Sequence, residues 1–273
     1  LALANKESLV VAGSLLVPEA RRRGVRILPV DSEHSAIFQA MQCGRLDEVK
    51  RVILTASGGP FRRATREQIE RATLADALNH PTWRMGNKIS IDSATMFNKG
   101  LEIIEACWLF DLPPSKIEVV IHPESVIHSM VEFVDGSVMA QLSPPDMRTP
   151  IQYALTYPQR TDGIGRRLDL TQPFDLHFEP PDFKRFPALR LAFDVASAGG
   201  TLGAVMNAAN EAAVAAFVSG KIPFGEISRV VGVTIAEHRL QAQPTLDDLL
   251  EADRWARQFV QLNLNRKGSA LAH

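Results

Sequence analysis

The chain has 273 residues, 45% of them hydrophobic, and its 30 lysines and arginines nearly balance 31 aspartates and glutamates. This length is enough to bury the core of one large domain or two smaller ones, and the balanced charge argues against binding to a nucleic-acid backbone. No stretch approaches the roughly 20 apolar residues of a membrane span, and no basic segment precedes an apolar one as in a signal peptide. Two cysteines without CysX2Cys spacing, which we expect to be buried thiols, favour a reducing compartment over zinc or disulfides.

The first part of the chain alternates helical and strand-like segments. The periodicity predicts helices over 9–16 and about 33–42, strands over 24–30 and 51–56, and a turn over 57–60. Residues 89–92 are predicted as a further strand that leads into a long helix over 93–110. This alternation is typical of an α/β domain.

The second part changes from strands to helices. Alternating apolar residues predict strands over 117–123, 128–134 and 137–142, the last two joined by a two-residue Asp135-Gly136 turn. A proline-rich stretch over 158–187 is typical of a long surface linker. Four Ala- and Leu-rich amphipathic segments predict a helical bundle, namely 188–197, 202–220, 224–238 and 245–264, followed by a frayed tail.

The first candidate site is a pair of carboxylates. Asp31 and Glu33 alternate around Ser32 after a predicted strand, so in an extended segment both point to one side and can share a divalent ion. The alternative is an ordinary helix N-cap, with an acidic residue in the first turn.

The second candidate site lies on the long helix. Asn98 and Glu102 are four residues apart and share a helical face, with Lys99 beside them to meet a phosphate or oxyanion. Gly100 weakens the helix, which indicates that something approaches its backbone closely. Oxygen ligands from these two carboxylate segments favour Mg²⁺ or Mn²⁺ over zinc; a solvated polar helix face remains the alternative.

Further polar groups follow the predicted strands. Ser57-Gly58-Gly59 and the segment around Ser93 offer hydroxyls and backbone N–H groups suited to phosphate. Bulky side chains beside Pro- and Gly-rich backbone favour a lid that excludes water, formed by Trp83, Met85 and the loop 143–150, with core packing as the alternative. Three histidines are possible donors or structural residues, namely His80, His122 and His128. Asn207, Asn210 and Glu211 we interpret as a helix cap outside the site.

Eight motifs together resemble a known family. They are LANKESLV, PVDSEHSA, LTASGGPFR, HPTWRMG, DSATMFNKGLE, HPESVIHSMV, SPPDMRTPI and NAANEA. In order, they are similar to 1-deoxy-D-xylulose 5-phosphate reductoisomerases, over nearly the whole chain. The resemblance implies a remnant of an NADPH-binding domain (1–31), a catalytic and dimerisation domain with a mixed sheet (32–157), a linker (158–187), a helical bundle (188–262) and a tail (263–273). No GxGxxG motif follows a strand near the start, so most of the cofactor domain is expected to be missing from this sequence.

The resemblance also assigns roles to individual residues. It implies that Mn²⁺, Mg²⁺ or Co²⁺ is bound by Asp31, Glu33 and Glu102, with Lys6, Glu33 and Glu102 catalytic. The expected substrate contacts are Lys6, Ser32, Glu33, Ser57, His80, Ser93, Asn98, Lys99 and Glu102. NADPH is expected at Asn5, Glu7 and Gly86, and the lid at Trp83, Met85 and Met147.

The implied activity is the metal-dependent rearrangement of 1-deoxy-D-xylulose 5-phosphate and its reduction by NADPH to 2-C-methyl-D-erythritol 4-phosphate, in non-mevalonate isoprenoid biosynthesis. We expect the reduction to be compromised in this chain. The alternatives are a phosphosugar isomerase or aldolase without nicotinamide, and a non-catalytic dimerisation or binding module. The resemblance also implies a homodimer, and we expect the bacterial cytoplasm, with a plastid as the other location known for the family.

Overall fold

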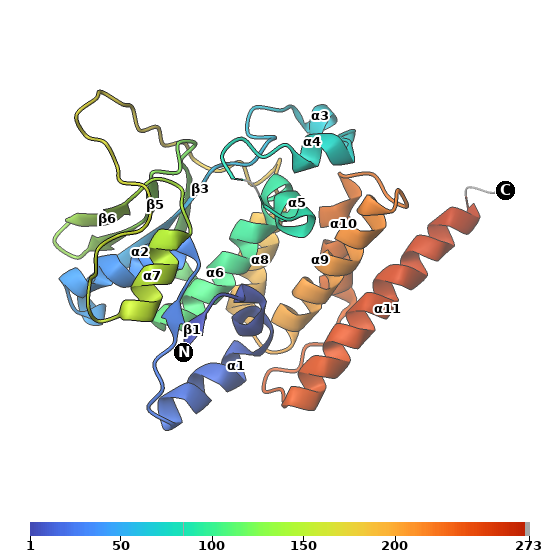
Figure 1. Cartoon of the computed structure of the whole chain (residues 1–273). Helices are drawn as coiled ribbons and strands as arrows, with labels where there is room; N and C mark the ends of the chain where they lie inside the picture. The colour runs from blue at the N-terminus through green and yellow to red at the C-terminus, as the bar shows by residue number, and fades with distance from the viewer. Residues whose placement is uncertain (84, 271–273) are drawn as a thin grey trace. The chain divides into compact units, whose positions relative to one another are not determined.

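A computed structural model describes residues 1–83 and 85–270 (Figure 1). The chain divides into two compact units. The first, the sheet unit, comprises 1–6, 17–58 and 106–181. The second, the helical unit, comprises 7–16, 59–105 and the described residues from 182 onward. Helix α1 (Lys6–Arg22), which departs from helical geometry at Ala12, and helix α6 (Phe97–Phe110) contribute residues to both.

The sheet unit contains a four-stranded mixed sheet in the order β4-β3-β5-β6 among the described residues. Strand β3 (Val49–Ala56) runs parallel to β4 (Ile117–Ile121) and antiparallel to β5 (Ile127–Phe133), and β6 (Val138–Leu142) forms an edge. Helix α2 (Ser32–Ala40) packs on β5 and β6, and α7 (Arg148–Thr156) contacts α2. The mixed sheet expected from the sequence is confirmed.

A short pair of parallel strands precedes α2 in the sheet unit. Strand β1 (Ala2–Leu3) pairs with β2 (Leu28–Pro29), so only two residues of the expected strand over 24–30 are extended in a ladder. Asp31 follows directly and caps α2. The predicted strand over 24–30 is therefore confirmed only at Leu28 and Pro29, and residues 24–27 are not in a strand.

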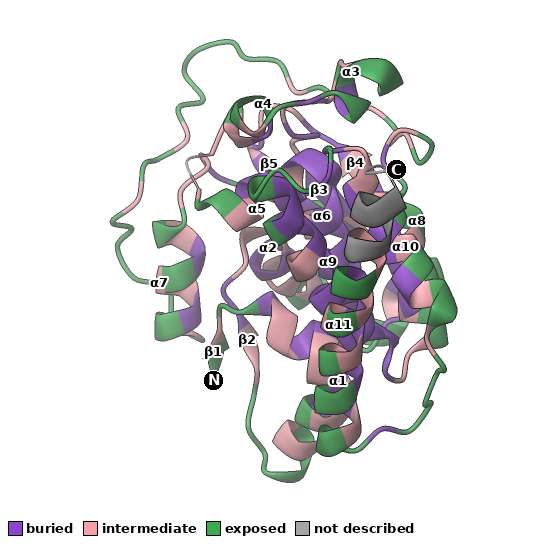
Figure 2. Cartoon of the chain, turned by 90° about the vertical axis from the view of Figure 1, so that its right-hand side faces the viewer, coloured by how far each residue is buried: buried purple, intermediate pink, exposed green. Residues whose placement is uncertain are grey.

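The helical unit has its core around α9 (Leu202–Val218), which is buried along most of its length (Figure 2). Helices α10 (Glu226–Glu237) and α11 (Leu246–Ala270) pack against α9, as does α8 (Ala188–Ala198). On α11, the buried residues Leu249, Ala252, Ala256 and Val260 follow helical spacing and face this core, while other positions remain exposed. The predicted four-helix segment is confirmed.

Two expectations about helices were wrong. Residues 89–92 are not a strand, because they lie inside α5 (Asn87–Thr95), and Met96 in the left-handed conformation separates α5 from α6. An apolar-polar alternation over four residues fits either structure, and no neighbouring strand pairs with it here. Helices α3 (Arg66–Glu70) and α4 (Leu74–Leu78) were missed, although Thr65-Gln68 and Thr73-Asp76 form capping boxes that signal both starts.

Other differences are local. Residues 134–137 connect β5 to β6, so the hairpin loop has four residues rather than two, and α7 was not anticipated. Between α7 and α8, the described chain has no helix or strand, apart from a bridge between Ile121 and Glu179, which agrees with a linker. The helix α11 continues to Ala270, beyond its predicted end at residue 264, and 271–273 lie outside the described residues. Across 1–83 and 85–270, no helix combines the length and apolar character of a membrane span.

Candidate active site

The sheet unit presents Asp31 and Glu33 at the start of α2. Asp31 is the N-cap, and its Oδ1 accepts a hydrogen bond from the Glu33 backbone N–H at 3.3 Å. The Ser32 hydroxyl donates to Glu33 Oε2 at 2.5 Å. The ordinary helix-cap interpretation is therefore correct, and it leaves the second oxygen of Asp31 for other partners.

Two basic side chains lie beside Asp31. Lys6 Nζ lies 2.6 Å from Asp31 Oδ2, and Nδ1 of the fully buried His34 lies 3.9 Å from Oδ1. Burial by itself would raise the pKa of Asp31, but the Lys6 ammonium and His34 outweigh it and hold the pKa well below its ordinary value. Asp31 is therefore a carboxylate at neutral pH, the form that a metal ion requires. His34 was not recognised from the sequence, although it stands one turn after the cap.

The donor chemistry of this segment fits a hard divalent cation. Asp31 and Glu33 offer carboxylate oxygens within 4.8 Å of each other. Carboxylate oxygens suit Mg²⁺ and Mn²⁺, whereas neither cysteine lies in this segment. The residues present in the sheet unit thus fit the metal that the sequence implies.

The helical unit holds the second polar group, at the start of α6. Glu102 is completely buried and Lys99 is 3% exposed. Asn98 donates from Nδ2 to Glu102 Oε1 at 2.5 Å, and the Lys99 ammonium pairs with Glu102 Oε2. The alternative of a solvated helix face is therefore wrong for Lys99 and Glu102, because both are buried and paired with each other. Both oxygens of the buried Glu102 carboxylate therefore have partners on the same helix.

Gly100 on the same helix is explained by packing. A Cβ there would lie 3.1 Å from Ala192 Cβ and 3.3 Å from the Ala188 carbonyl oxygen, both on α8. Something does approach the backbone closely, as the sequence indicated, and it is a neighbouring helix of the same unit. Gly100 therefore carries no evidence for a ligand.

The Ser-Gly-Gly turn leaves the end of β3. Ser57 is half-buried in the sheet unit, and Gly58 and Gly59 both have positive φ. A Cβ on Gly59 would stand 2.7 Å from the Ser93 carbonyl oxygen in α5, so this glycine permits a close approach to the turn that carries Ser93. Ser93 itself is half-buried. The turn has the backbone freedom that the sequence predicted.

Two of the residues expected to form a lid, Trp83 and Met85, lie in the segment before α5. The His80 ring accepts hydrogen bonds at Nδ1 from the backbone N–H groups of Thr82 at 3.1 Å and Trp83 at 2.9 Å, and burial lowers the pKa of this histidine. Trp83 and Met85 are half-buried, and Arg84 between them lies outside the described residues. Gly86, the N-cap of α5, has ordinary φ and open space around its missing Cβ, so neither backbone nor packing requires glycine there.

The remaining predicted site residues divide between the units. In the sheet unit, Asn5 is exposed before α1, and Met147 is 38% exposed at the start of α7. In the helical unit, Glu7 lies 3.3 Å from the ammonium of Lys88 on α5. The expectation that both cysteines are buried was wrong for Cys43, which is exposed.

Two of the three candidate histidines have structural partners in the sheet unit. His122 accepts at Nε2 from the backbone N–H groups of Val126 and Ile127, both at 3.2 Å, and donates from Nδ1 to the His177 carbonyl at 2.9 Å. His128 contacts the Ser143 carbonyl through Nε2 at 3.2 Å. These contacts favour the structural interpretation of both residues.

The asparagines of α9 were misread from the sequence. Helix α9 begins at Leu202, so Asn207 and Asn210 lie in its interior and do not cap it. Both are buried, and Asn210 donates from Nδ2 to Asp92 Oδ1 at 2.9 Å. Asp92 also pairs with Lys88 at 2.6 Å. The signal for this buried cluster was available, since asparagines inside a run of helix-forming residues need a tertiary reason.

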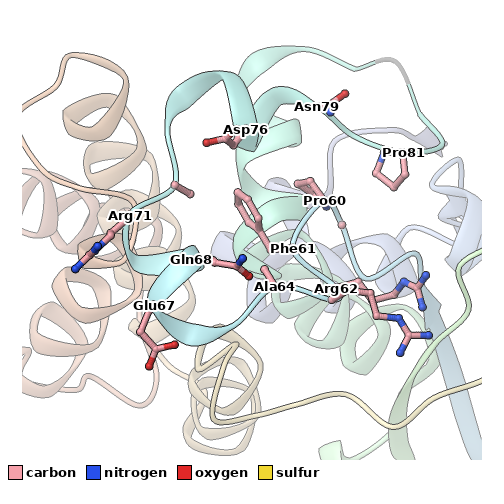
Figure 3. Close-up of a pocket in the computed structure, with 13 residues that line it drawn as sticks. Pro60, Phe61, Arg62, Ala64, Glu67, Gln68, Arg71, Asp76, Asn79 and Pro81 are labelled. Atoms are coloured by element: carbon pink, nitrogen blue, oxygen red, sulfur yellow. The ribbon is translucent and has the colours of Figure 1, made fainter.

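A separate cavity lies in the helical unit. It measures about 780 Å³ and is lined by residues 59–64, 67, 68, 71, 72, 76, 79 and 81. In Figure 3, Phe61 and Gln68 lie toward its centre, whereas Glu67 and Arg71 point away from it. Gly59, the last residue of the Ser-Gly-Gly turn, is the one predicted site position among these lining residues, so the cavity begins at that turn and otherwise involves other residues.

Comparison with known proteins identifies the family. The fold is that of an α/β protein with a C-terminal helical bundle. Carboxylates lie at the start of α2, and a lysine and a carboxylate lie at the start of α6. Models of the 1-deoxy-D-xylulose 5-phosphate reductoisomerase C-terminal domain and the DXP reductoisomerase C-terminal domain match residues 27–110 and 142–259, respectively. This chain belongs to the 1-deoxy-D-xylulose 5-phosphate reductoisomerase family, as the sequence motifs indicated.

Individual relatives agree with this assignment. The chain is 54% identical over 261 residues to the reductoisomerase of Acetivibrio thermocellus, covering 96% of this chain and 68% of the relative. The reductoisomerase of Exiguobacterium sibiricum is 58% identical over 259 residues, covering 94% and 67%. The sequence thus spans about two thirds of these relatives.

Solved structures share the fold. The enzyme from Zymomonas mobilis in complex with NADPH has a TM-score of 0.90 at 49% identity, covering 96% of this chain and 68% of that one. A reductoisomerase in complex with NADPH, fosmidomycin and magnesium has a TM-score of 0.91 at 43% identity, covering 97% and 69%. The cofactors expected from the sequence, NADPH and a divalent cation, are those that this second structure holds.

Proposed function

We propose that this chain binds 1-deoxy-D-xylulose 5-phosphate together with Mg²⁺ or Mn²⁺, and that it forms the metal- and substrate-binding part of an NADPH-dependent reductoisomerase. The observation that carries the proposal is the ionised Asp31 beside Glu33, two carboxylates that fit a hard cation, in a member of this family. Asp31 and Glu33, with Glu102, are the proposed metal ligands. When bound, the ion supplies Lewis-acid chemistry to the substrate's carbonyl and hydroxyl oxygens.

The phosphate is proposed to meet the polar groups of α5 and α6. Ser93, Asn98 and Lys99 supply a hydroxyl, an amide and an ammonium, and Ser57 adds a second hydroxyl. Support comes from the types of these groups, because an ammonium, an amide and hydroxyls are hydrogen-bond donors that suit phosphate oxygens, and Lys99 is held buried at the start of α6. Binding energy from this remote group orients the reacting end of the sugar.

Other residues are proposed to shape the reacting end. Lys6 keeps Asp31 ionised and also contacts the substrate. Ser32 and His80 donate hydrogen bonds to the substrate. Trp83 and Met85 exclude water from the reacting end, and Met147 does so from a second loop. NADPH supplies hydride when bound, and the proposed contacts are Asn5, Glu7 and Gly86. The absence of any packing reason for glycine at 86 supports this assignment. Because these 273 residues contain no GxGxxG motif after a strand near their start, we expect the hydride step to be compromised in them.

We further propose that the sheet unit forms a homodimer through β6. This strand is an edge, and it exposes the apolar side chains of Val138, Met139 and Leu142. An apolar edge strand is a template for pairing with another chain, and a second copy provides an identical, self-complementary strand. The bacterial cytoplasm remains the proposed location.

The test is calorimetric titration of the chain with 1-deoxy-D-xylulose 5-phosphate, with and without Mn²⁺. Binding that requires Mn²⁺ is expected. Equal binding in both conditions would refute the metal assignment, and no binding would refute the claim that these residues suffice for the site. Product analysis without NADPH then separates the reductoisomerase from a nicotinamide-independent isomerase or aldolase, which would release a stable sugar phosphate product.

A further inference from the structure

A chain of polar contacts links three helices within the helical unit. Glu7 on α1 contacts the Lys88 ammonium at 3.3 Å, Lys88 pairs with Asp92 at 2.6 Å, and Asn210 on α9 donates to Asp92 at 2.9 Å. Lys88 and Asp92 both lie on α5 at i, i+4 spacing. The cluster Lys88-Asp92-Asn210 therefore joins α5 to the central helix of the bundle by a charge-assisted contact.

Burial makes this cluster an unusual way to join two helices. Asp92 is 1% exposed and Asn210 is fully buried. Among the described residues, the Oδ1 atoms of Asn207 and Asn210 have no hydrogen-bond partner. A buried acceptor without a donor costs free energy, and apolar side chains in place of a buried ionic cluster are often equally stabilising. Stability alone therefore does not account for these residue types.

The position of the cluster points to another role. Asp92 immediately precedes Ser93, and Gly86 is the N-cap of the same helix. The expected lid residues come just before this helix, and the cluster ends at Glu7, a proposed NADPH contact. Turning or shifting α5 by a fraction of a turn would move Ser93 and Gly86 together.

We propose that Lys88, Asp92 and Asn210 are positioning residues, which hold α5 in one orientation against α9 so that Ser93 is presented to the substrate phosphate. This role rests on the proposed function for Ser93. Asp92 accepts from both sides, one oxygen facing the Asn210 amide and the other the Lys88 ammonium, so the cluster defines the rotation of α5 as well as its distance from α9. Simple apolar packing defines rotation less strictly, because it is not directional.

An exchanged pair tests this geometry. Asn210→Asp places a second carboxylate against Asp92, and Asp92→Asn removes the negative charge that pairs with the Lys88 ammonium. In the double variant Asp92→Asn/Asn210→Asp, the new amide on α5 can donate to the new carboxylate on α9 while its oxygen accepts from Lys88, which restores the pattern of donors and acceptors. Asp253→Asn, which removes an ion pair within α11 of the same unit, is the matched control.

Hydrogen-deuterium exchange of residues 87–95 and substrate titration with Mn²⁺ are measured on each variant. We expect each single variant to raise exchange in α5 and to weaken substrate binding by about tenfold, a loss equivalent to one ordinary hydrogen bond to a charged group. The double variant should recover both, and Asp253→Asn should alter neither. If the cluster is merely structural, the single variants should have a lower melting temperature. Their affinity for substrate should then be unchanged at temperatures where they are folded.

The outcomes separate this proposal from the function on which it rests. Unchanged exchange in α5 in both single variants, or no recovery in the double variant, would overturn the positioning role. So would raised exchange with unaltered substrate affinity. If the unmodified chain does not bind substrate, the proposed function fails, and the exchange pattern still decides whether the cluster holds α5.

Discussion

The ammonium of Lys6 lies 2.6 Å from the carboxylate of Asp31, and both side chains are largely buried in the sheet unit. Lys6 begins α1, whereas Asp31 caps α2 after β2, so the pair joins the ends of two segments separated by a helix and a strand. Because of this pair, Asp31 remains ionised despite its burial. Removing the charge of Lys6 is therefore the most direct test of how the pair keeps Asp31 ionised.

We expect Lys6→Met to lower the free energy of unfolding by about 3 kcal/mol at pH 7, because it leaves an uncompensated buried charge. The pKa of Asp31 is depressed below 3.8, so its contribution to stability is present above that value and is lost as the pH falls through the folded-state pKa. In Lys6→Met, burial should instead raise this pKa, so acidification should stabilise the variant. Denaturant unfolding in a chelator, at several pH values, measures both effects.

The matched control is Lys6→Met/Asp31→Asn, which also removes the orphaned charge and should recover most of the loss. If Lys6→Met costs under about 1 kcal/mol, the pair behaves as an exposed one and the electrostatic argument is incorrect.

Glu33→Gln should abolish Mn²⁺-dependent binding of substrate. Even outer partners of metal ligands contribute about 10- to 100-fold in affinity, so loss of a ligand should cost at least ~100-fold. Calorimetry provides the measurement, and Glu118→Gln, on β4 with a half-exposed side chain, is the control that should bind normally. If Glu33→Gln still binds substrate normally in the presence of Mn²⁺, the alternative of a non-catalytic dimerisation or binding module would be favoured.

Gly59→Ala should destabilise the chain by about 1–3 kcal/mol, since φ is +64° and the new Cβ would stand 2.7 Å from the Ser93 carbonyl. Gly136→Ala shares the positive φ but has open space, so it separates backbone strain from the clash. Thermal or denaturant unfolding should show the larger loss for Gly59. If both variants lose the same free energy of unfolding, the clash between the new Cβ and the Ser93 carbonyl costs nothing measurable.

The two cysteines should react at different rates. Burial raises the pKa of Cys107 to about 12, whereas Cys43 is exposed. Because the thiolate is the nucleophile, iodoacetamide at pH 8 should modify Cys43 rapidly and Cys107 slowly. Mass spectrometry of timed samples resolves the two, and Cys43→Ser should remove the fast phase. Two modifications at similar rates would contradict the burial of Cys107.

The proposed dimer depends on the exposed apolar edge at β6. Val138→Glu/Met139→Glu should shift the chain toward monomer, because like charges would face each other across a symmetric contact. Sedimentation velocity measures the change, with Leu262→Glu on the exposed side of α11 as the control. An unchanged sedimentation coefficient would exclude β6 from the interface, and a monomeric unmodified chain would exclude the dimer.

Much of the architecture could be predicted from periodicity. The strands β3 to β6 and the helices α8 to α11 follow apolar patterns of two and 3.6 residues, which burial of one face imposes on any chain. Prediction failed where the pattern was short, as at 89–92, or where capping rather than hydrophobicity began a helix, as at Thr65 and Thr73.

The sequence by itself determined the family and the residue types of the site, because chemically specific motifs such as VDSEHSA and NKGLE survive as contiguous strings. Only the tertiary structure decided what each polar group contacts. It assigned Gly100 to helix packing, His122 to a backbone turn and Asn210 to a buried carboxylate on another helix. The physical reason is that hydrogen bonds and ion pairs act over about 3 Å in space, whereas Asp92 and Asn210 are separated by 118 positions in sequence.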